Sequence, residues 1–197
     1  IPNGEPRVEL IIPTRDKVEI LRTAVESILQ KTKYKNFSIT IVDNQSCETK
    51  TQRFFKSIQK KHPTRVKVIK YNKNFNYSAI NNYAVRKTDA EIIGLVNNDV
   101  EAIDPEWLTE MVSHANRPDV GCVGAKLFYS NDTIQHGGVL IGIGEVAGHA
   151  HKYFPKSSSG YVDRLVHTQQ MSAVTAACLL VRRELYEQVG GLNEKDL

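Results

Sequence analysis

Short apolar runs alternate with amphipathic segments through the first half of this sequence. Buried strands are predicted for the apolar runs at Val8–Ile12, Phe37–Val42, Val66–Tyr71 and Glu91–Val96. Apolar residues at helical spacing predict helices between them, at Lys17–Gln30, across Phe54, Phe55 and Ile58, and at Tyr77–Arg86. Strands that alternate with helices form a mainly parallel sheet, because each crossover helix packs on one of its faces. The order of these segments therefore predicts an α/β fold with a mixed, mainly parallel sheet and helices on both faces.

Polar side chains follow three of the predicted strands at the point where each strand ends. They are Thr14-Arg15-Asp16 after the first strand, Asp43-Asn44 after the second and Asn97-Asn98-Asp99 after the fourth. In open parallel sheets, ligands bind in the crevice beyond the carboxyl ends of the strands. We therefore expect these three strand ends to converge on one ligand site.

The second half of the sequence has shorter segments and a long loop. Asp104 before Pro105 predicts the N-cap and first turn of a helix that continues to Ala115. The glycines, serines and histidines of 142–160 predict a functional or mobile loop. The remaining predicted elements are strands at Val120–Phe128, Val139–Ile143 and Ala173–Val181, and a helix at Arg183–Val189 that Gly190-Gly191 ends. No repeat or second domain is visible, so we expect a single domain over 1–197.

The Asn97-Asn98-Asp99 turn offers oxygen ligands to a hard divalent cation. Such a cation neutralises diphosphates and prefers carboxylate and carboxamide oxygens on a short, fixed loop. Asp99 is the carboxylate of the three and is the expected metal ligand, with Mn²⁺ or Mg²⁺ as the expected cofactor. The alternative is a plain turn, because Asn and Asp are common wherever a strand ends.

Asp43 and the histidines are further candidates for ligand contact. A carboxylate at a strand end, as at Asp43, can accept a hydrogen bond from a nucleobase or a ribose hydroxyl. The alternative is a turn cap formed with Asn44 and Ser46. His149 and His151 favour ligand contact only slightly over exposed loop positions, and for His136 we favour an ordinary loop histidine.

Composition and missing motifs exclude several classes. The net charge of +4 is small and its basic residues are scattered, which is not the footprint of a nucleic-acid-binding protein. The sequence has no GxGxxG, no GxxxxGK[ST] and no GxSxG motif, so dinucleotide, P-loop and serine-hydrolase readings lack their signatures. Three widely spaced cysteines, with no membrane-spanning run or signal-peptide pattern, favour a reducing, cytoplasmic location.

Seven segments, taken in order, resemble the family 2 glycosyltransferases of GT-A (Rossmann-like) fold. Among these, they resemble the bacterial rhamnosyltransferase-like enzymes that build surface polysaccharides. They are Ile11–Asp16, Ile41–Ser46, Phe75–Asn82, Asn97–Asp99, Val123–Leu127, Gly148–His151 and Ser172–Cys178. The resemblance extends from Val8 to Glu194. Each segment alone is weak evidence for the family, but all seven in this order are specific for it.

The resemblance implies a nucleotide-binding half at 1–100 and a sugar- and acceptor-binding half at 101–197. It assigns three groups of residues. The nucleotide would contact Pro13, Thr14, Arg15, Asp43, Asn76, Ala79, Asn97 and Asn98. Asp99 would bind the metal, and Ala176, Ala177 and Cys178, with His149 and His151, would border the sugar and acceptor cleft.

The sequence departs from the family pattern in two places. Asn97 replaces the first aspartate of the DxD-like motif, which predicts weaker metal affinity. The acidic general base of the family is expected beyond Leu197, so we expect the chain to be incomplete at its C-terminus and inactive alone.

The resemblance implies transfer of a hexosyl group, with inversion, from a UDP- or dTDP-linked sugar to a saccharide or lipid-linked acceptor. O-antigen or other cell-envelope polysaccharide synthesis is the implied setting. A lipid-linked acceptor would place the protein peripherally at the inner face of the membrane. The alternatives are a non-catalytic nucleotide-sugar-binding module and, less well supported, a nucleotidyltransferase, because Pro13–Asp16 lacks the glycines of a triphosphate loop.

Overall fold

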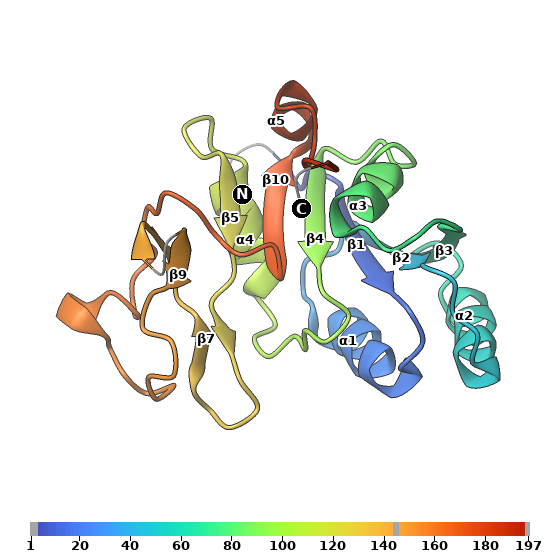
Figure 1. The fold of residues 1–197 in the computed structure, drawn as a ribbon, viewed down its shortest axis with the longest axis horizontal. Helices are drawn as coiled ribbons and strands as arrows, with labels where there is room; N and C mark the ends of the chain where they lie inside the picture. The colour runs from blue at the N-terminus through green and yellow to red at the C-terminus, as the bar shows by residue number, and fades with distance from the viewer. Residues whose placement is uncertain (1–3, 144–145, 196–197) are drawn as a thin grey trace.

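A computed structural model describes residues 4–143 and 146–195 of the chain (Figure 1). Its first half alternates strands with helices. In order, they are β1 (Val8–Thr14), α1 (Val18–Lys31), β2 (Phe37–Asp43), α2 (Thr49–Lys61), β3 (Val66–Lys70), α3 (Tyr77–Val85) and β4 (Ile92–Val96). The predicted elements of this half are therefore confirmed, with boundary shifts of one or a few residues.

The second half contains α4 (Trp107–Ala115) and α5 (Arg183–Gln188) and several short strands. The strands are β5 (Cys122–Gly124), β6 (Leu127–Phe128), β7 (Ile134–His136), β8 (Val139–Ile141), β9 (Ala147–His149) and β10 (Cys178–Arg182). A short 3₁₀ turn, η2, covers Tyr161–Asp163. Among the described residues, no helix is long and apolar enough to cross a bilayer.

The main sheet has the strand order β3-β2-β1-β4-β10-β5. Strands β3, β2, β1 and β4 run parallel, whereas β10 is antiparallel to both of its neighbours. The predicted mixed, mainly parallel sheet is thus confirmed. Because the parallel strands share one direction, their carboxyl ends meet at one edge of the sheet.

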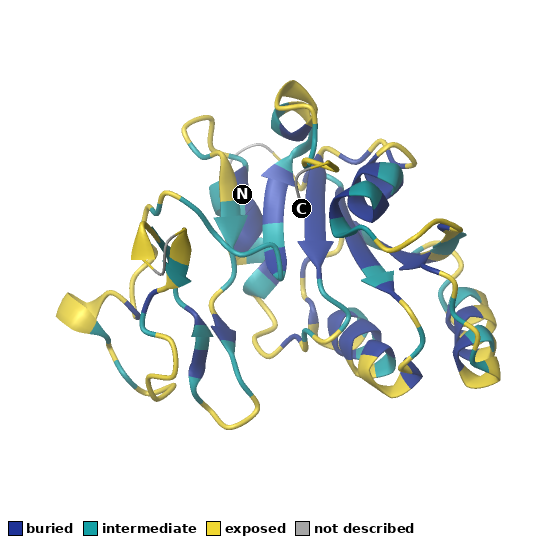
Figure 2. Ribbon diagram, viewed as in Figure 1, coloured by how far each residue is buried: buried dark blue, intermediate teal, exposed yellow. Residues whose placement is uncertain are grey.

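Alternate residues of β1 supply two separate hydrophobic cores. Leu10 and Ile12 pack with α1, α2 and α4 on one face, whereas Ile11 packs with α3 and α5 on the other. Both faces of the sheet are covered, which is why the central strands are apolar throughout rather than alternating. Figure 2 shows the resulting buried centre.

Pro13 lies inside β1, one residue beyond the strand predicted at Val8–Ile12. The N–H groups of even-numbered residues in β1 point toward β2, as the bond from Val8 N to Asn36 O shows. Pro13 therefore faces β4, but the pairing with β4 ends at Ile11. The missing N–H removes no hydrogen bond of the sheet there.

Two predicted strands of the second half are wrong in extent. Val120–Phe128 is not one strand, because it divides into β5 of the main sheet and β6, which pairs with β7 in a separate hairpin. Ala173–Val181 forms a strand only from Cys178 onward. Cys178 pairs with Val96, the last residue of β4, so the preceding residues have no neighbouring strand of the main sheet to join.

The predicted cap of α4 is also wrong. The helix begins at Trp107, and the Asp104 carboxylate instead accepts the backbone N–H of Glu106 at 2.8 Å in a preceding turn. The carbonyl of Pro105 accepts the N–H of Lys33 at 3.0 Å, which holds the turn against the end of α1. The helix therefore begins two residues later than predicted, after a turn that contacts the end of α1.

Two antiparallel hairpins, β6–β7 and β8–β9, project from the main sheet (Figure 1). Strand β7 was not predicted, and β9 lies within the segment 142–160 that was predicted as a loop. Residues 144 and 145 of that segment lie outside the described residues. Figure 2 shows that this projecting region is much more exposed than the main sheet.

Candidate functional site

The carboxyl ends of β1, β2 and β4 are joined to one another by hydrogen bonds. The side-chain amide of Asn98 donates to the hydroxyl of Thr14 at 3.1 Å, which connects β4 to β1. The N–H of Asn44 donates to the Thr14 carbonyl at 2.9 Å, which connects β2 to β1. The strand ends therefore converge on one edge of the sheet, toward which the arrows of β1 and β4 point in Figure 1.

Asp16 connects the loop after β1 to the loop after β2. Its Oδ1 accepts the N–H groups of Cys47 and Glu48 at 2.9 and 2.8 Å, and its own N–H donates to the Ser46 hydroxyl at 2.9 Å. Asp16 and Lys17 both adopt left-handed backbone angles, with φ of 52° and 51°. The sequence placed Asp16 at the strand end but gave no signal for this contact, since the left-handed pair carries no glycine.

Asp43 is buried and caps the turn that follows β2. Its Oδ1 accepts the N–H of Ser46 at 2.9 Å, and its Oδ2 accepts a longer hydrogen bond of 3.4 Å from Gln52. The turn cap named as the alternative is therefore present. A carboxylate has further lone pairs, so contact with a nucleotide remains a prediction.

Asn44 is a site residue whose role the sequence did not reveal. Its amide donates to the carbonyls of Tyr71 and Lys73 at 3.0 and 2.8 Å, which fixes the chain after β3 against the end of β2. Its Oδ1 is buried and has no hydrogen-bond partner among the described residues. The position of an asparagine directly after a buried strand was the available signal.

Arg15 and Asp99 are the charged groups of the converging strand ends that point away from the protein. Both are exposed, and within 4–143 and 146–195 neither makes an ion pair or a side-chain hydrogen bond. Pro13, Asn97 and Asn98 are half-buried beside them, and the N–H of Asn97 donates to the Ala177 carbonyl at 2.9 Å. Free charges of both signs at a fixed edge suit an anionic ligand with a bound cation.

The residues around Asp99 fit a divalent cation that is bound jointly by the protein and a diphosphate. No three His, Cys, Asp or Glu side chains gather into a metal site among the described residues. Mg²⁺ and similar ions are, however, commonly held by one or two carboxylates together with substrate phosphates. Asp99 supplies one unpaired carboxylate, and Asn97 and Asn98 supply neutral amide oxygens nearby.

Asn76 and Ala79 lie at the start of α3. The Asn76 side chain accepts the N–H of Ala79 at 2.8 Å as the helix N-cap and donates to the Glu194 carbonyl at 2.9 Å. Ala79 lines a pocket of about 270 Å³ between the end of β3 and α3, with Tyr71, Tyr83 and Glu194. Their contact with a nucleotide stays a prediction.

A smaller pocket of about 140 Å³ lies between the main sheet and the two hairpins. It brings together His149 and Ala177 of the predicted cleft. It also includes His136, which was expected to be an ordinary loop residue but is 2% exposed. The remaining lining residues come from β6 and the residue after it, from β7, from the turn after β9 and from the segment before β10. They are Leu127, Tyr129, Gln135, Lys152 and Thr175.

Three residues predicted for the cleft do not line this pocket. The assignment of Cys178 to the cleft needs correction. Its side chain is 2% exposed and packs in the core on the face of the sheet that α1, α2 and α4 cover. The Ala176 carbonyl accepts the Tyr77 hydroxyl at 3.1 Å, and its side chain packs toward α3. His151 lies in the turn after β9, where its Nε2 accepts the N–H of Tyr161 at 3.2 Å.

The imidazoles of His136 and His149 are in direct contact, with 3.0 Å between their Nδ1 atoms. One ring must donate to the other, so the pair shares one hydrogen. Burial, and then the neighbouring His149, lower the pKa of His136 to about 4. His136 is therefore neutral at pH 7.

Comparisons with known proteins show the family of this chain. The family profile described as Glycosyl transferase family 2 matches residues 9–190. An uncharacterized protein, y4gI, of Sinorhizobium fredii is 53% identical over 194 residues, which are 98% of this chain and 21% of that protein. The O-antigen biosynthesis protein RfbC of Myxococcus xanthus is 38% identical over 193 residues, which are 98% of this chain and 15% of RfbC. The chain thus spans about a fifth or less of these relatives.

Solved structures share the fold. A mannosyltransferase of Pyrobaculum calidifontis, solved with GDP-Man and Mn²⁺, superposes with a TM-score of 0.72 at 17% identity, over 98% of this chain and 49% of that one. GalNAc-T7, solved with UDP, GalNAc and Mn²⁺, gives a TM-score of 0.76 at 14% identity, over 98% and 38%. At these identities the likeness shows the fold alone, and the expected GT-A fold is confirmed.

Proposed function

Since this chain belongs to glycosyl transferase family 2, we propose that it takes part in transfer of a sugar from a nucleoside diphosphate to a saccharide or lipid-linked acceptor. A UDP- or dTDP-linked hexose is the proposed donor, and polysaccharide or O-antigen synthesis is the proposed setting. We propose this activity for the whole protein, because the relatives are several times longer than this chain.

The convergence of three strand ends carries this proposal. Thr14, Asn44 and Asn98 fix the ends of β1, β2 and β4 to one another, and the unpaired charges of Arg15 and Asp99 project from that edge. A ligand with both a phosphate charge and a bound cation is complementary to these charges. The nucleoside would then lie over Pro13, Thr14 and Asp43, and its diphosphate near Asn97, Asn98 and Asp99.

Asp99 is the proposed ligand of Mn²⁺ or Mg²⁺. The cation, when bound, neutralises the charge that develops on the departing nucleoside diphosphate. Both structural neighbours were solved with Mn²⁺ and a nucleotide or nucleotide sugar, which supports a divalent cation here. We propose transfer with inversion, in which an acceptor hydroxyl attacks the anomeric carbon in line and loses its proton to a base.

A non-catalytic nucleotide-sugar-binding module is the second candidate. Asn97 in place of an acidic residue favours it, since fewer carboxylates bind a cation more weakly. Product analysis with the full-length protein separates the two candidates. A glycosylated product that disappears in the Asp99→Ala variant supports the enzyme, whereas binding of the nucleotide sugar without turnover supports the module.

Calorimetric titration with UDP, dTDP and GDP, with and without Mn²⁺, tests the donor site. We expect Mn²⁺ to strengthen the binding of one nucleotide and Asp99→Ala to abolish that effect. Glu5→Ala is the control, because the exposed Glu5 makes no ion pair within the described residues and precedes β1, at the opposite edge of the sheet. If neither this chain nor the full-length protein binds any nucleotide in a metal-dependent way, the proposed donor site is wrong.

A further inference from the structure

The pocket between the two hairpins and the main sheet is separate from the strand ends that we assign to the nucleotide, but adjoins them. Ala177 lines this pocket, and its carbonyl accepts the N–H of Asn97 at 2.9 Å. A group in the pocket would therefore lie next to the proposed diphosphate position. Its volume of about 140 Å³ is roughly that of four or five water molecules, so it suits one compact group rather than a whole oligosaccharide.

The polar side chains of this pocket include one cation and several groups that can donate hydrogen bonds. Lys152 makes no ion pair within the described residues, and hydrogen bonding to Tyr153, with the nearby Tyr129, raises its pKa, so it stays charged. The Thr175 hydroxyl accepts the Ala177 N–H at 3.3 Å and keeps its own O–H to donate. Among the described residues that line the pocket, none is a carboxylate.

The histidine pair adds a further donor. When one Nδ1 donates to the other, the accepting ring carries its own hydrogen on Nε2. That N–H is not used within the pair.

We propose that this pocket binds a phosphate group carried by the acceptor. A phosphate has three strong acceptor oxygens, which match several convergent donors better than the two oxygens of a carboxylate do. Lys152 would supply the charge, and the histidine pair, Thr175 and Tyr129 would supply hydrogen bonds. The assignment to the acceptor rests on the proposed function, whereas the binding of phosphate does not.

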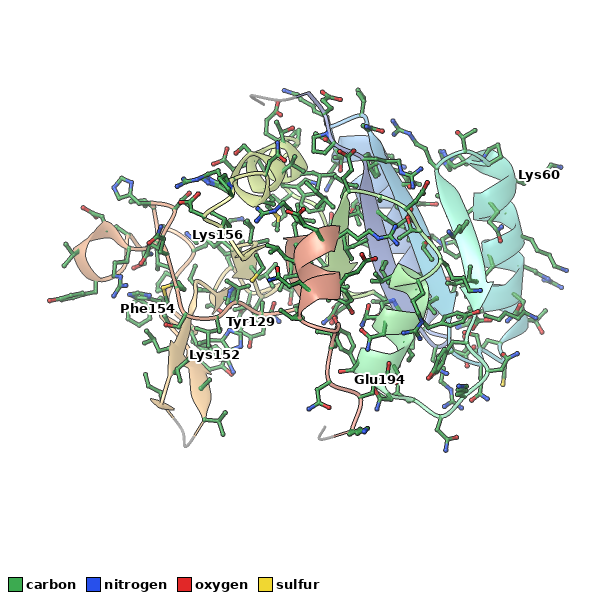
Figure 3. All side chains as sticks on the ribbon, turned by 90° about the horizontal axis from the view of Figure 1, so that it is seen from above. Lys60, Tyr129, Lys152, Phe154, Lys156 and Glu194 are labelled. Carbon is green, nitrogen blue, oxygen red and sulfur yellow. The ribbon has the colours of Figure 1, made fainter. Side chains whose placement is uncertain are left out.

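Titration of this chain with inorganic phosphate, followed by NMR of the imidazole nitrogens, tests the pocket. We expect saturable shifts of the His136 and His149 signals, with those of the remote His62 and His114 unchanged. Lys152→Met should weaken the affinity about tenfold, as loss of a charged hydrogen bond does. Lys60→Met is the matched control, because Lys60 is exposed on α2 at the opposite end of the molecule from Lys152 (Figure 3).

Repeating the phosphate titration on the chain saturated with UDP and diamagnetic Mg²⁺ separates the pocket from the donor site. Undiminished phosphate binding supports a separate acceptor-phosphate site, whereas competition places the phosphate at Asp99 and overturns the proposal. The proposal is equally overturned if millimolar phosphate leaves His149 unshifted, or if Lys60→Met weakens binding as much as Lys152→Met. Nucleotide binding without a phosphate site would leave the proposed function standing and remove this inference alone.

Discussion

The carboxylate of Asp16 accepts the backbone N–H of Glu48, the residue that precedes α2, at 2.8 Å. Together with the bond from Cys47, this contact holds the loop after β1 against the start of α2. The carboxylate also lies where the positive end of the helix dipole favours a negative charge. The loop that carries Arg15 is thus fixed by a side chain that does not itself face the proposed ligand.

Asp16→Ala should lower the free energy of unfolding by about 1–3 kcal/mol, because two backbone N–H groups lose a charged acceptor. Urea denaturation measures this difference. Asp99→Ala is the control, since that exposed carboxylate has no partner among the described residues and its loss should change stability by less than about 0.5 kcal/mol. Equal effects of the two substitutions would show that the Asp16 contact is not stabilising.

Asn97→Asp should strengthen metal-dependent nucleotide binding. A second carboxylate beside Asp99 adds a charged oxygen ligand, which hard divalent cations prefer to an amide. We expect the Mn²⁺ concentration needed for half-maximal UDP or dTDP binding to fall about tenfold, an effect of about 1.4 kcal/mol. Asn131→Asp, on the exposed turn before β7, is the control for added charge. An unchanged Mn²⁺ requirement would argue against a cation at this turn.

Acid should destabilise the protein through His136. The folded state lowers the pKa of this histidine from 6.5 to about 4, so only the unfolded chain takes up a proton between these values. The stability that neutral His136 provides is complete above pH 6.5 and is lost as the pH falls toward 4, by about 3 kcal/mol at most. Urea unfolding at several pH values should show a shallower acid slope for His136→Gln. His167→Gln, at an exposed histidine, should keep the wild-type slope.

A buried carboxylate in β1 is satisfied by hydroxyl groups. Glu9 is 4% exposed and accepts hydrogen bonds from Ser38, Thr40 and Thr88 at 2.8, 2.5 and 3.2 Å. Glu9→Ala should cost about 2–4 kcal/mol of stability, because it leaves buried hydroxyls without their acceptor. Glu9→Gln keeps an acceptor oxygen and should lose less stability than Glu9→Ala. Thermal denaturation of both variants and of the wild type measures the difference. A larger loss for Gln than for Ala would contradict this account.

The cysteines should differ sharply in reactivity. Cys47 and Cys122 are exposed, whereas Cys178 is buried, and burial raises the pKa of its thiol to about 12. The thiolate is the reactive form, so a thiol-specific reagent should modify Cys178 only after unfolding. Labelling followed by mass spectrometry checks this, with Cys178→Ala as the reference. Modification of Cys178 in the native protein would show that β10 separates readily from β4.

The sheet and the converging strand ends were predictable because their signals are local and strong. A buried strand such as β4 is a continuous apolar run, and the polar residues that follow it, Asn97 to Asp99, mark where it ends. The order of such segments predicted the mainly parallel sheet, whereas the GT-A fold was predicted from the resemblance to family 2 glycosyltransferases.

The sequence was less informative where pairing depends on distant partners. The apolar run before Cys178 does not reveal that β4 ends at Val96, so β10 was predicted too long. The assignment of Cys178 to the cleft came from the family resemblance, which does not indicate which side chains of that segment are buried. The contact between His136 and His149 arises only when the two hairpins meet. The role of Asp16 depends on left-handed backbone angles at Asp16 and Lys17. The sequence does not indicate these angles, because neither residue is a glycine.

The strand order also determines when the sheet can be completed during synthesis. Strand β10 lies between β4 and β5 in space but follows both in the chain. The edges of β4 and β5 that face β10 therefore stay unpaired until the ribosome has passed Arg182. An apolar strand with a free edge is prone to pair with other chains. Between translation of β4 and arrival of β10, the nascent chain therefore carries an apolar strand edge that other chains can pair with.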